Sequence, residues 1–131
     1  MHRGGCLCGR VAFEIEGPLP PIQICHCSQC RRAQGGPFAT NVPVAESALR
    51  WLRGEALLKS YESSPGKFRV FCSECGSPIY SRRLSLPGVV RLRAGLLDEP
   101  VASAVELHMH VASKASWWSI VDELPQHQGP Y

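Results

Sequence analysis

Three cysteines lie within one six-residue segment, and their spacing suits metal chemistry. Gaps of one and two residues separate Cys25, Cys27 and Cys30, so a turning backbone can direct all three sulfur atoms at one point. A borderline-soft divalent ion, zinc above all, binds such a set of thiolates. Three protein ligands leave one position of a tetrahedral ion open, which is typical of catalytic zinc. The segment therefore predicts a reactive metal centre.

Four further cysteines form two pairs, Cys6 with Cys8 and Cys72 with Cys75. Each pair supplies two sulfur atoms from a short loop, and two such loops together make a closed Cys₄ site. We therefore expect a structural zinc at the two pairs and a catalytic zinc at the group of three. An odd total of seven cysteines argues against a complete disulfide framework. Buried free thiols, a redox pair and an iron–sulfur ligand set are the alternatives.

The segments around the cysteines predict short strands joined by turns. Residues 10–16 alternate, with Val11, Phe13 and Ile15 on one face, which is the pattern of a half-buried strand. Further extended segments are expected at 22–24, 38–44, 56–61, 68–71, 79–82, 89–94 and 105–111. No long segment has the 3.6-residue period of a helix. The sequence thus predicts a mostly β fold with short helical turns.

The residues that follow the group of three are expected to shape the open metal position. Residues 28–33 predict a helical turn or two, with Ser28 as the N-terminal cap. Gly35-Gly36-Pro37-Phe38 is a tight loop with an aromatic tip, and it comes directly after this turn. We expect the loop to form one wall of the site.

Length and composition restrict the class of protein. A chain of 131 residues fits one domain, here residues 1–131 with a flexible tail at 124–131. No run approaches the roughly 18 apolar residues of a membrane span, and the absence of an apolar leader predicts the cytoplasm. The formal net charge of +3 counts the thiols as neutral. Seven thiolates with two divalent ions would bring it to zero, which argues against nucleic-acid binding by bulk charge.

The three cysteine motifs, in their order, give the chain a specific resemblance. They read Gly4-x-Cys6-x-Cys8-Gly9, Cys25-His26-Cys27-x-x-Cys30-Arg31 and Phe71-Cys72-x-x-Cys75-Gly76-Ser77. Together with the loop at 35–38 they resemble the glutathione-dependent formaldehyde-activating enzyme family, which also contains centromere protein V. The similarity runs from about Gly4 to Ile120 and includes Gly95-Leu96-Leu97-Asp98 and the histidine segment that follows it.

The resemblance implies a single-domain, β-tent-like zinc fold with two metal sites. It implies a structural zinc on Cys6, Cys8, Cys72 and Cys75, and a catalytic zinc on Cys25, Cys27 and Cys30. The implied reaction is addition of a thiol such as glutathione to formaldehyde, or the reverse cleavage of the carbon–sulfur bond. A second class stays open, a zinc-stabilised binding module without catalysis, but the intact group of three favours the carbon–sulfur lyase.

Glutathione is anionic, so this resemblance also implies basic partners near the metal. Lys59, Lys67, Arg69 and Lys114 are candidates, and Arg31 and Arg32 are preferred because they adjoin the cysteines. The residues predicted to contact the substrate are therefore Arg31, Arg32, Gly35, Gly36 and Phe38.

The histidines are weaker candidates for a role at the metal. His26 is expected to point away from the ion, because it lies between two ligands in an extended backbone. His108 and His110 are expected to share one face of a strand, a spacing that can bind metal, but they have no partner pair, and His108 is instead a candidate proton carrier near the open site. No membrane or nucleic-acid partner is expected, and the sequence does not decide between a monomer and an oligomer.

Overall fold

Ten strands divide between two sheets in the computed structural model, which describes all residues from 1 to 131. The small sheet has the order β1-β2-β5 and consists of β1 (His2–Gly5), β2 (Ala12–Ile15) and β5 (Leu49–Arg53). The large sheet has the order β10-β3-β4-β9-β8-β7-β6. Its strands are β3 (Ile22–Cys25), β4 (Ala39–Ala45), β6 (Leu58–Ser64), β7 (Lys67–Cys72), β8 (Pro78–Arg83), β9 (Val89–Arg93) and β10 (Val105–Met109). The mostly β prediction is confirmed.

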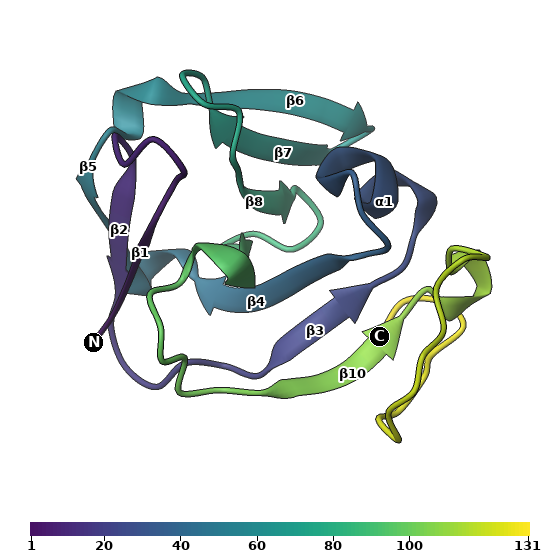
Figure 1. Ribbon diagram of the computed structural model, residues 1–131. Helices are drawn as coiled ribbons and strands as arrows, with labels where there is room; N and C mark the ends of the chain where they lie inside the picture. Colours follow the sequence, from purple (N-terminus) through teal and green to yellow (C-terminus); the bar gives the residue numbers. More distant parts are fainter.

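The two sheets meet around one main core. Figure 1 shows the strands of the large sheet following one another from β6 at the top to β10 at the bottom, with β1 and β2 at the left end. All neighbours in the large sheet are antiparallel except β3 and β10, which are parallel. Val11, Phe13 and Ile15 are buried in this core, as their alternation predicted.

The other face of β2 is also buried, which differs from the half-buried strand that was predicted. Glu14 is almost fully buried and forms ion pairs with Arg3 and Arg50. β2 is the central strand of the small sheet, so the long side chains of both neighbouring strands cover its outer face. An alternating pattern does not reveal such cover because the covering residues are distant in sequence.

The N-terminal cap of the α-helix α1 (Ser28–Gln34) lies one residue earlier than predicted. The N-terminal cap is Cys27, whose Sγ accepts a hydrogen bond from the backbone N–H of Cys30 at 3.2 Å. Sulfur here fills the role that Ser, Thr, Asp or Asn usually has, so a search for those residues selected Ser28 instead. Gly35 ends the helix with a positive φ of 66°, the usual C-terminal geometry for glycine.

Short 3₁₀ turns occupy several of the connections between strands. They are η1 (Glu46–Ala48), η2 (Glu55–Leu57), η3 (Ala94–Leu96) and η4 (Val111–Ser113). No helix in the structure has both the length and the apolar character that crossing a membrane requires.

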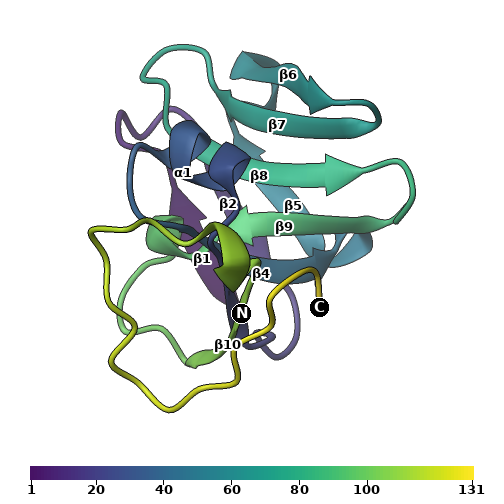
Figure 2. The same ribbon diagram turned by 90° about the vertical axis from the view of Figure 1, so that its right-hand side faces the viewer.

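The segment predicted as a tail, residues 124–131, is attached to the end of β10. Figure 2 shows the chain after β10 extending below α1 before it returns. The N–H of His108 donates to the carbonyl of Pro125, and the N–H of His127 donates to the carbonyl of His108, both at 2.9 Å. Further backbone bonds join His110 to Gly129 and Val111 to His127. The segment thus has fixed backbone partners, and its flexibility stays a prediction.

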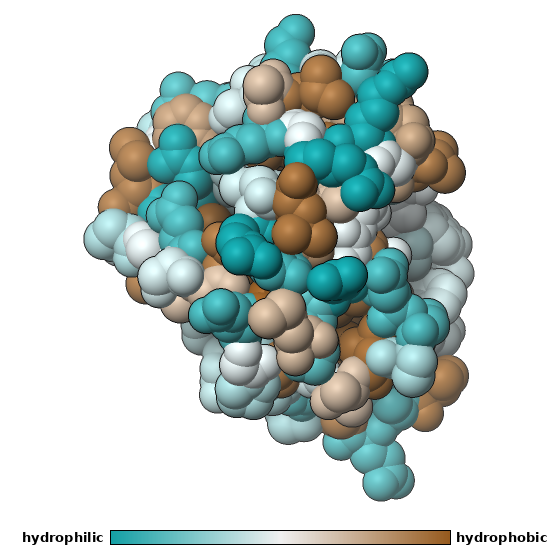
Figure 3. Space-filling view, turned by 90° about the vertical axis from the view of Figure 1, so that its left-hand side faces the viewer, coloured by the Kyte–Doolittle hydropathy of each residue, from teal (hydrophilic) through white to brown (hydrophobic).

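Hydrophobic side chains are scattered over the face formed at the small sheet. Figure 3 shows brown residues there among teal and white ones, without one continuous brown area. Single exposed hydrophobic residues such as Leu52 of β5 are ordinary on protein surfaces. This face therefore offers no argument for a docking surface.

Candidate metal centres

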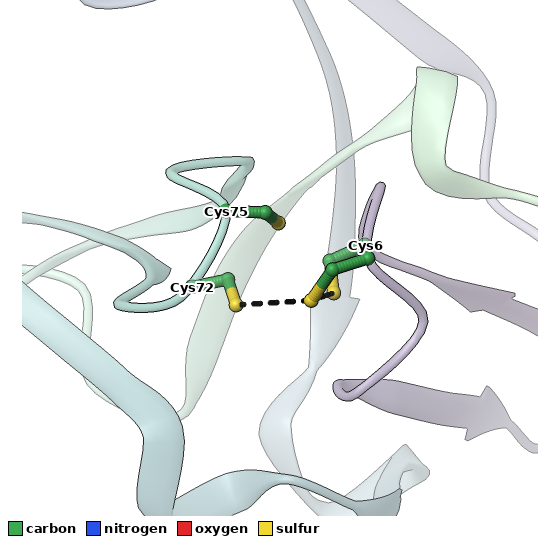
Figure 4. Close-up of side chains that lie close together, drawn as sticks. Cys6, Cys72 and Cys75 are labelled. Atoms are coloured by element: carbon green, nitrogen blue, oxygen red, sulfur yellow. Dashed lines mark hydrogen bonds between the residues drawn. The ribbon is translucent and has the colours of Figure 1, made fainter.

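The first metal centre joins the start of the chain to the end of β7. The sulfur atoms of Cys6, Cys8, Cys72 and Cys75 all lie within 4.8 Å of one another. Figure 4 shows Cys6, Cys72 and Cys75 pointing toward one another from two separate loops. The Sγ atoms of Cys6 and Cys8 are 3.5 Å apart, and those of Cys8 and Cys72 are 3.9 Å apart. Sulfur atoms around a tetrahedral zinc are separated by about 3.8 Å, so the group fits such an ion.

Ser77 connects the two loops of this centre. Its Oγ accepts a hydrogen bond from the N–H of Leu7 at 3.0 Å and lies 3.2 Å from the Sγ of Cys75. Hydrogen bonds from the side chain and backbone of Ser77 lower the pKa of Cys75 to about 5. The N–H of Val11 likewise donates to the Sγ of Cys6 at 3.3 Å. These donors favour thiolates, the form in which cysteine binds a metal.

The second metal centre lies where β3 meets α1. Cys25 ends β3, Cys27 caps the helix, and Cys30 lies in its first turn, so the three predicted residues come together. Their sulfur atoms are within 4.8 Å of one another, and none of the seven cysteines forms a disulfide. No other histidine, cysteine or carboxylate belongs to this group. The group can therefore hold a metal ion through three sulfur atoms.

Cys27 differs from its two neighbours in exposure. Cys25 and Cys30 are buried, whereas Cys27 is half-buried. Hydrogen bonds from the side chains of Cys25 and Cys30 lower the pKa of Cys27, whereas hydrogen bonds with Cys27 and Cys30 raise the pKa of Cys25. A low thiol pKa is a property of reactive and metal-binding cysteines.

Arginines adjoin the second centre. The guanidinium nitrogens of Arg69 lie 3.8 and 3.9 Å from the Sγ of Cys30. Arg93 of β9 is also buried, and burial lowers its pKa to about 10, against the opposing effect of Cys30. Arg69 was a sequence candidate, but Arg93 was not. The signal that could have found it is the presence of two arginines, Arg91 and Arg93, within a short strand whose other residues are apolar.

A cavity of about 710 Å³ opens beside the second centre. Cys27 lines it together with the start of α1, the β6–β7 turn and the β8–β9 turn. Lys67 and Arg83 are its basic lining residues, and His110 is its imidazole. Of the six basic residues considered from the sequence, only Lys67 reaches this cavity. Arg83 was missed because it becomes a neighbour of Cys27 only through the fold.

The residues predicted to contact the substrate do not line this cavity. They are Arg31, Arg32, Gly35, Gly36 and Phe38. Only the first residues of α1 face the cavity, whereas Arg31 and Arg32 lie in the last turn of the helix. Phe38 instead packs edge-on against His26 and Trp118, with ring centroids 5.4 and 5.6 Å apart. These residues are close to the cysteines in sequence, but this did not predict whether they lie at the cavity beside Cys27.

A buried chain of hydrogen bonds runs from His26 to the surface. The Nε2 of His26 lies 2.9 Å from the Nδ1 of His108, whose Nε2 lies 3.0 Å from a carboxylate oxygen of Asp122. His26 is fully buried, and burial lowers its pKa to about 4. As expected, it is absent from the sulfur group. Sequence reasoning missed Asp122, which the fold alone brings to His108.

His108 and His110 do not share a strand face, so this expectation is wrong. β10 ends at Met109, and His110 adopts a left-handed backbone conformation with a φ of 56°. This change of backbone directs His110 to the cavity beside Cys27, whereas His108 bonds to His26.

Replacing His108 by leucine is expected to destabilise the fold. The variant leaves both ring nitrogens of buried His26 without a partner, because His26 Nδ1 already has none. A buried polar group without a hydrogen bond costs roughly 1–3 kcal/mol. Urea denaturation of the metal-loaded protein measures this loss. Asp122→Ala is the matched control and should cost less, because it keeps the bond between the histidines; an equal or larger loss in the control would contradict the assignment.

These features define a class: a mostly β protein with one group of four and one group of three cysteines that could each hold a metal ion. Residues 1–113 match the family model described as glutathione-dependent formaldehyde-activating enzyme, and the chain belongs to this family. An uncharacterized lyase of Schizosaccharomyces pombe is 29% identical over 79 residues, which are 60% of this chain. The match spans 56% of that relative, so the chain covers about half of its length.

A solved structure supports the same fold. The crystal structure of a Rhodobacter sphaeroides protein, a structural-genomics target, is similar with a TM-score of 0.64. It is 27% identical, and the match covers 79% of this chain and 98% of that chain.

Proposed function

We propose that this protein is a zinc-dependent carbon–sulfur lyase that forms or cleaves an adduct of a thiol and an aldehyde, such as S-hydroxymethylglutathione. The observation that carries the proposal is the position of Cys27. Its sulfur belongs to a group of three metal ligands, and its side chain also lines a cavity with basic walls. Family membership and the lyase among the relatives support the same reaction class.

The proposed cofactors are two zinc ions with different roles. Cys6, Cys8, Cys72 and Cys75 would hold a structural ion, and Cys25, Cys27 and Cys30 a catalytic one. When bound to three sulfurs, zinc supplies an open position and the Lewis acidity that stabilises a thiolate or polarises a carbonyl group. The hydrogen-bond donors around these sulfur atoms would help to keep the ligands ionised.

The cavity residues would bind and orient the thiol substrate. The cations of Lys67 and Arg83 would receive the carboxylates of a peptide thiol, which places the thiol end toward Cys27. In the forward direction, a carbon–sulfur bond forms and the thiol proton ends on the former carbonyl oxygen. The reverse reaction breaks this bond and returns the proton to sulfur. His110 is the imidazole in the cavity wall that would carry the proton between them.

Magnetisation-exchange NMR tests this proposal directly. The zinc content is first determined by elemental analysis, with two ions expected per chain. Glutathione and formaldehyde are then mixed, and the exchange rate between free glutathione and S-hydroxymethylglutathione is measured with and without protein. We expect the protein to accelerate exchange above the spontaneous rate. A single zinc with no acceleration would instead favour the binding module without catalysis.

The basic cavity residues should affect acidic thiols specifically. Lys67→Met and Arg83→Met are each expected to raise the KM for glutathione about tenfold, because a hydrogen bond to a charged group contributes roughly 1.5–3 kcal/mol. The KM for 2-mercaptoethanol, which has no carboxylate, should stay unchanged. Arg32→Met is the comparison variant, since this residue was the sequence-based choice but does not line the cavity. If only Arg32→Met raised the KM for glutathione, Arg32 would be the residue that binds its carboxylates, in place of Lys67 and Arg83.

A further inference from the structure

A second, smaller cavity lies between the end of α1 and the strands β6 to β9. Its volume is about 310 Å³, which is in the range of small-molecule sites. Gln34, Arg69 and Arg93 line it together with the tyrosines Tyr61 and Tyr80. It shares no lining residue with the cavity beside Cys27. The proposed lyase reaction assigns no role to this second cavity.

Two donors of this cavity have no acceptor. The Nε of Arg93 and the Nε2 of Gln34 are both buried and form no hydrogen bond. Buried polar groups in folded proteins almost always have a partner, and each missing one carries a cost. Two such donors on residues that line the same cavity indicate an acceptor that the chain itself does not provide.

The charge around this cavity also lacks a partner. Arg69 and Arg93 are only 8% and 5% exposed, and neither forms a salt bridge with a carboxylate. Buried charges normally have an opposite charge beside them. The nearest negative group is the thiolate of Cys30, which Arg69 contacts. Arg93 has no such contact, and its one hydrogen bond is to the neutral amide of Asn41.

The chain provides hydrogen-bond partners for every side-chain nitrogen of Arg69, but not for all of those of Arg93. Arg69 bonds to Ser63 through its Nε and to Cys30 through its terminal nitrogens, so all three of its nitrogen atoms have partners. Arg93 donates from one terminal nitrogen to Asn41, and its Nε remains free. Direct contact with a thiol therefore accounts for the first arginine alone, whereas Cys30 and Cys25 act on Arg93 only through longer-range electrostatics.

We propose that this second cavity binds an organic carboxylate whose oxygens accept hydrogen bonds from Arg93 and Gln34. A guanidinium group matches the planar carboxylate in geometry and charge. Half of the ten lining residues are hydrophobic, and Tyr61 and Tyr80 are among them, so the cavity also offers surface for an apolar body. This surface distinguishes an organic acid from inorganic phosphate, which has no apolar part.

Titration with sodium benzoate tests the proposal on the full-length, zinc-loaded protein. Nitrogen-15 NMR follows the Nε–H of Arg93 and the side-chain amide of Gln34 at constant ionic strength. We expect benzoate to shift both signals in a saturable way. Benzamide, the neutral analogue of benzoate, and inorganic phosphate should each bind at least tenfold more weakly than benzoate. Equal binding of benzoate and benzamide, equal or tighter binding of phosphate, or no saturable shift with benzoate, would overturn the proposal.

Two substitutions of Gln34 separate binding from folding. Gln34→Met removes the amide donor at similar size and should weaken benzoate binding about tenfold. Gln34→Glu supplies a carboxylate within the cavity, so it should abolish benzoate binding and raise the melting temperature. Arg10→Gln is the charge control, because Arg10 is exposed and outside the cavity; its benzoate affinity should be unchanged.

The outcome does not depend on the proposed lyase reaction. Glutathione and aldehyde are absent from the titration, so failure to bind benzoate leaves the lyase proposal intact. Failure of the protein to accelerate glutathione exchange likewise leaves the carboxylate proposal intact. A lower melting temperature in Gln34→Glu, or unchanged benzoate affinity in Gln34→Met, would contradict the carboxylate site.

Discussion

Cys27→Ser will lose thiol-dependent activity while it keeps the fold. The sulfur of Cys27 belongs to the three-thiol centre and is the one that reaches the large cavity. A serine hydroxyl binds zinc far less well than a thiolate, so the second ion should be lost. Serine is also a preferred helix cap, so it can keep the hydrogen bond with the N–H of Cys30. The substitution thus separates the metal ligand from the structural cap.

Two measurements check this expected loss. The zinc content from elemental analysis should fall from two ions per chain to one. The rate of glutathione exchange should fall at least about 100-fold, which is more than the 10–100-fold loss typical of residues that only support a metal ligand. Ser28→Ala provides the control, because Ser28 lines the same cavity but is not a ligand; its zinc content should stay at two. Full activity with two ions in Cys27→Ser would refute the lyase proposal.

Cys72→Ser will unfold the protein at ordinary temperature. Cys72 is completely buried at the end of β7, and its sulfur meets that of Cys8 across 64 residues of sequence. A structural zinc contributes on the order of 10 kcal/mol, which is comparable to the roughly 5–15 kcal/mol of a whole domain. Loss of one ligand leaves the N-terminal loop without its anchor.

Circular dichroism during heating checks the second expectation. The wild type should melt cooperatively, and Cys72→Ser should show no transition; a strong chelator should have the same effect on the wild type. Ser73→Ala is the control in the same turn, because Ser73 is exposed and is not a ligand. A melting temperature of Cys72→Ser within a few degrees of the wild type would show that the four-cysteine centre is not structural.

The contrast between these two variants follows from the position of each centre in the fold. The four-cysteine group joins two loops that are distant in sequence, so its ligands close the chain on itself. The three-cysteine group comes from one continuous segment, so its loss opens no long loop. Stability should therefore depend mainly on the first centre and reactivity on the second.

The sequence by itself determined both sulfur groups and most of the strands, although it did not predict β1 and β5 of the small sheet. Alternation of apolar residues depends on local backbone geometry, and it located the buried face of β2 at Val11, Phe13 and Ile15. The spacing of Cys25, Cys27 and Cys30 is also local, and one short segment brings their sulfurs together. The division of seven cysteines into four and three followed from ligand chemistry, which requires no knowledge of the topology.

Only the tertiary structure decided which side chains surround those sulfurs. Arg69 and Arg93 adjoin Cys30 from β7 and β9, and Asp122 reaches His108 from beyond β10. The polar lining of the large cavity likewise comes from turns that are far apart in the chain. Such neighbours depend on the order and register of strands, which no local pattern contains. Sequence proximity selected Arg31 and Arg32 instead, and the helix carries both away from the cavity because its later residues turn to other sides.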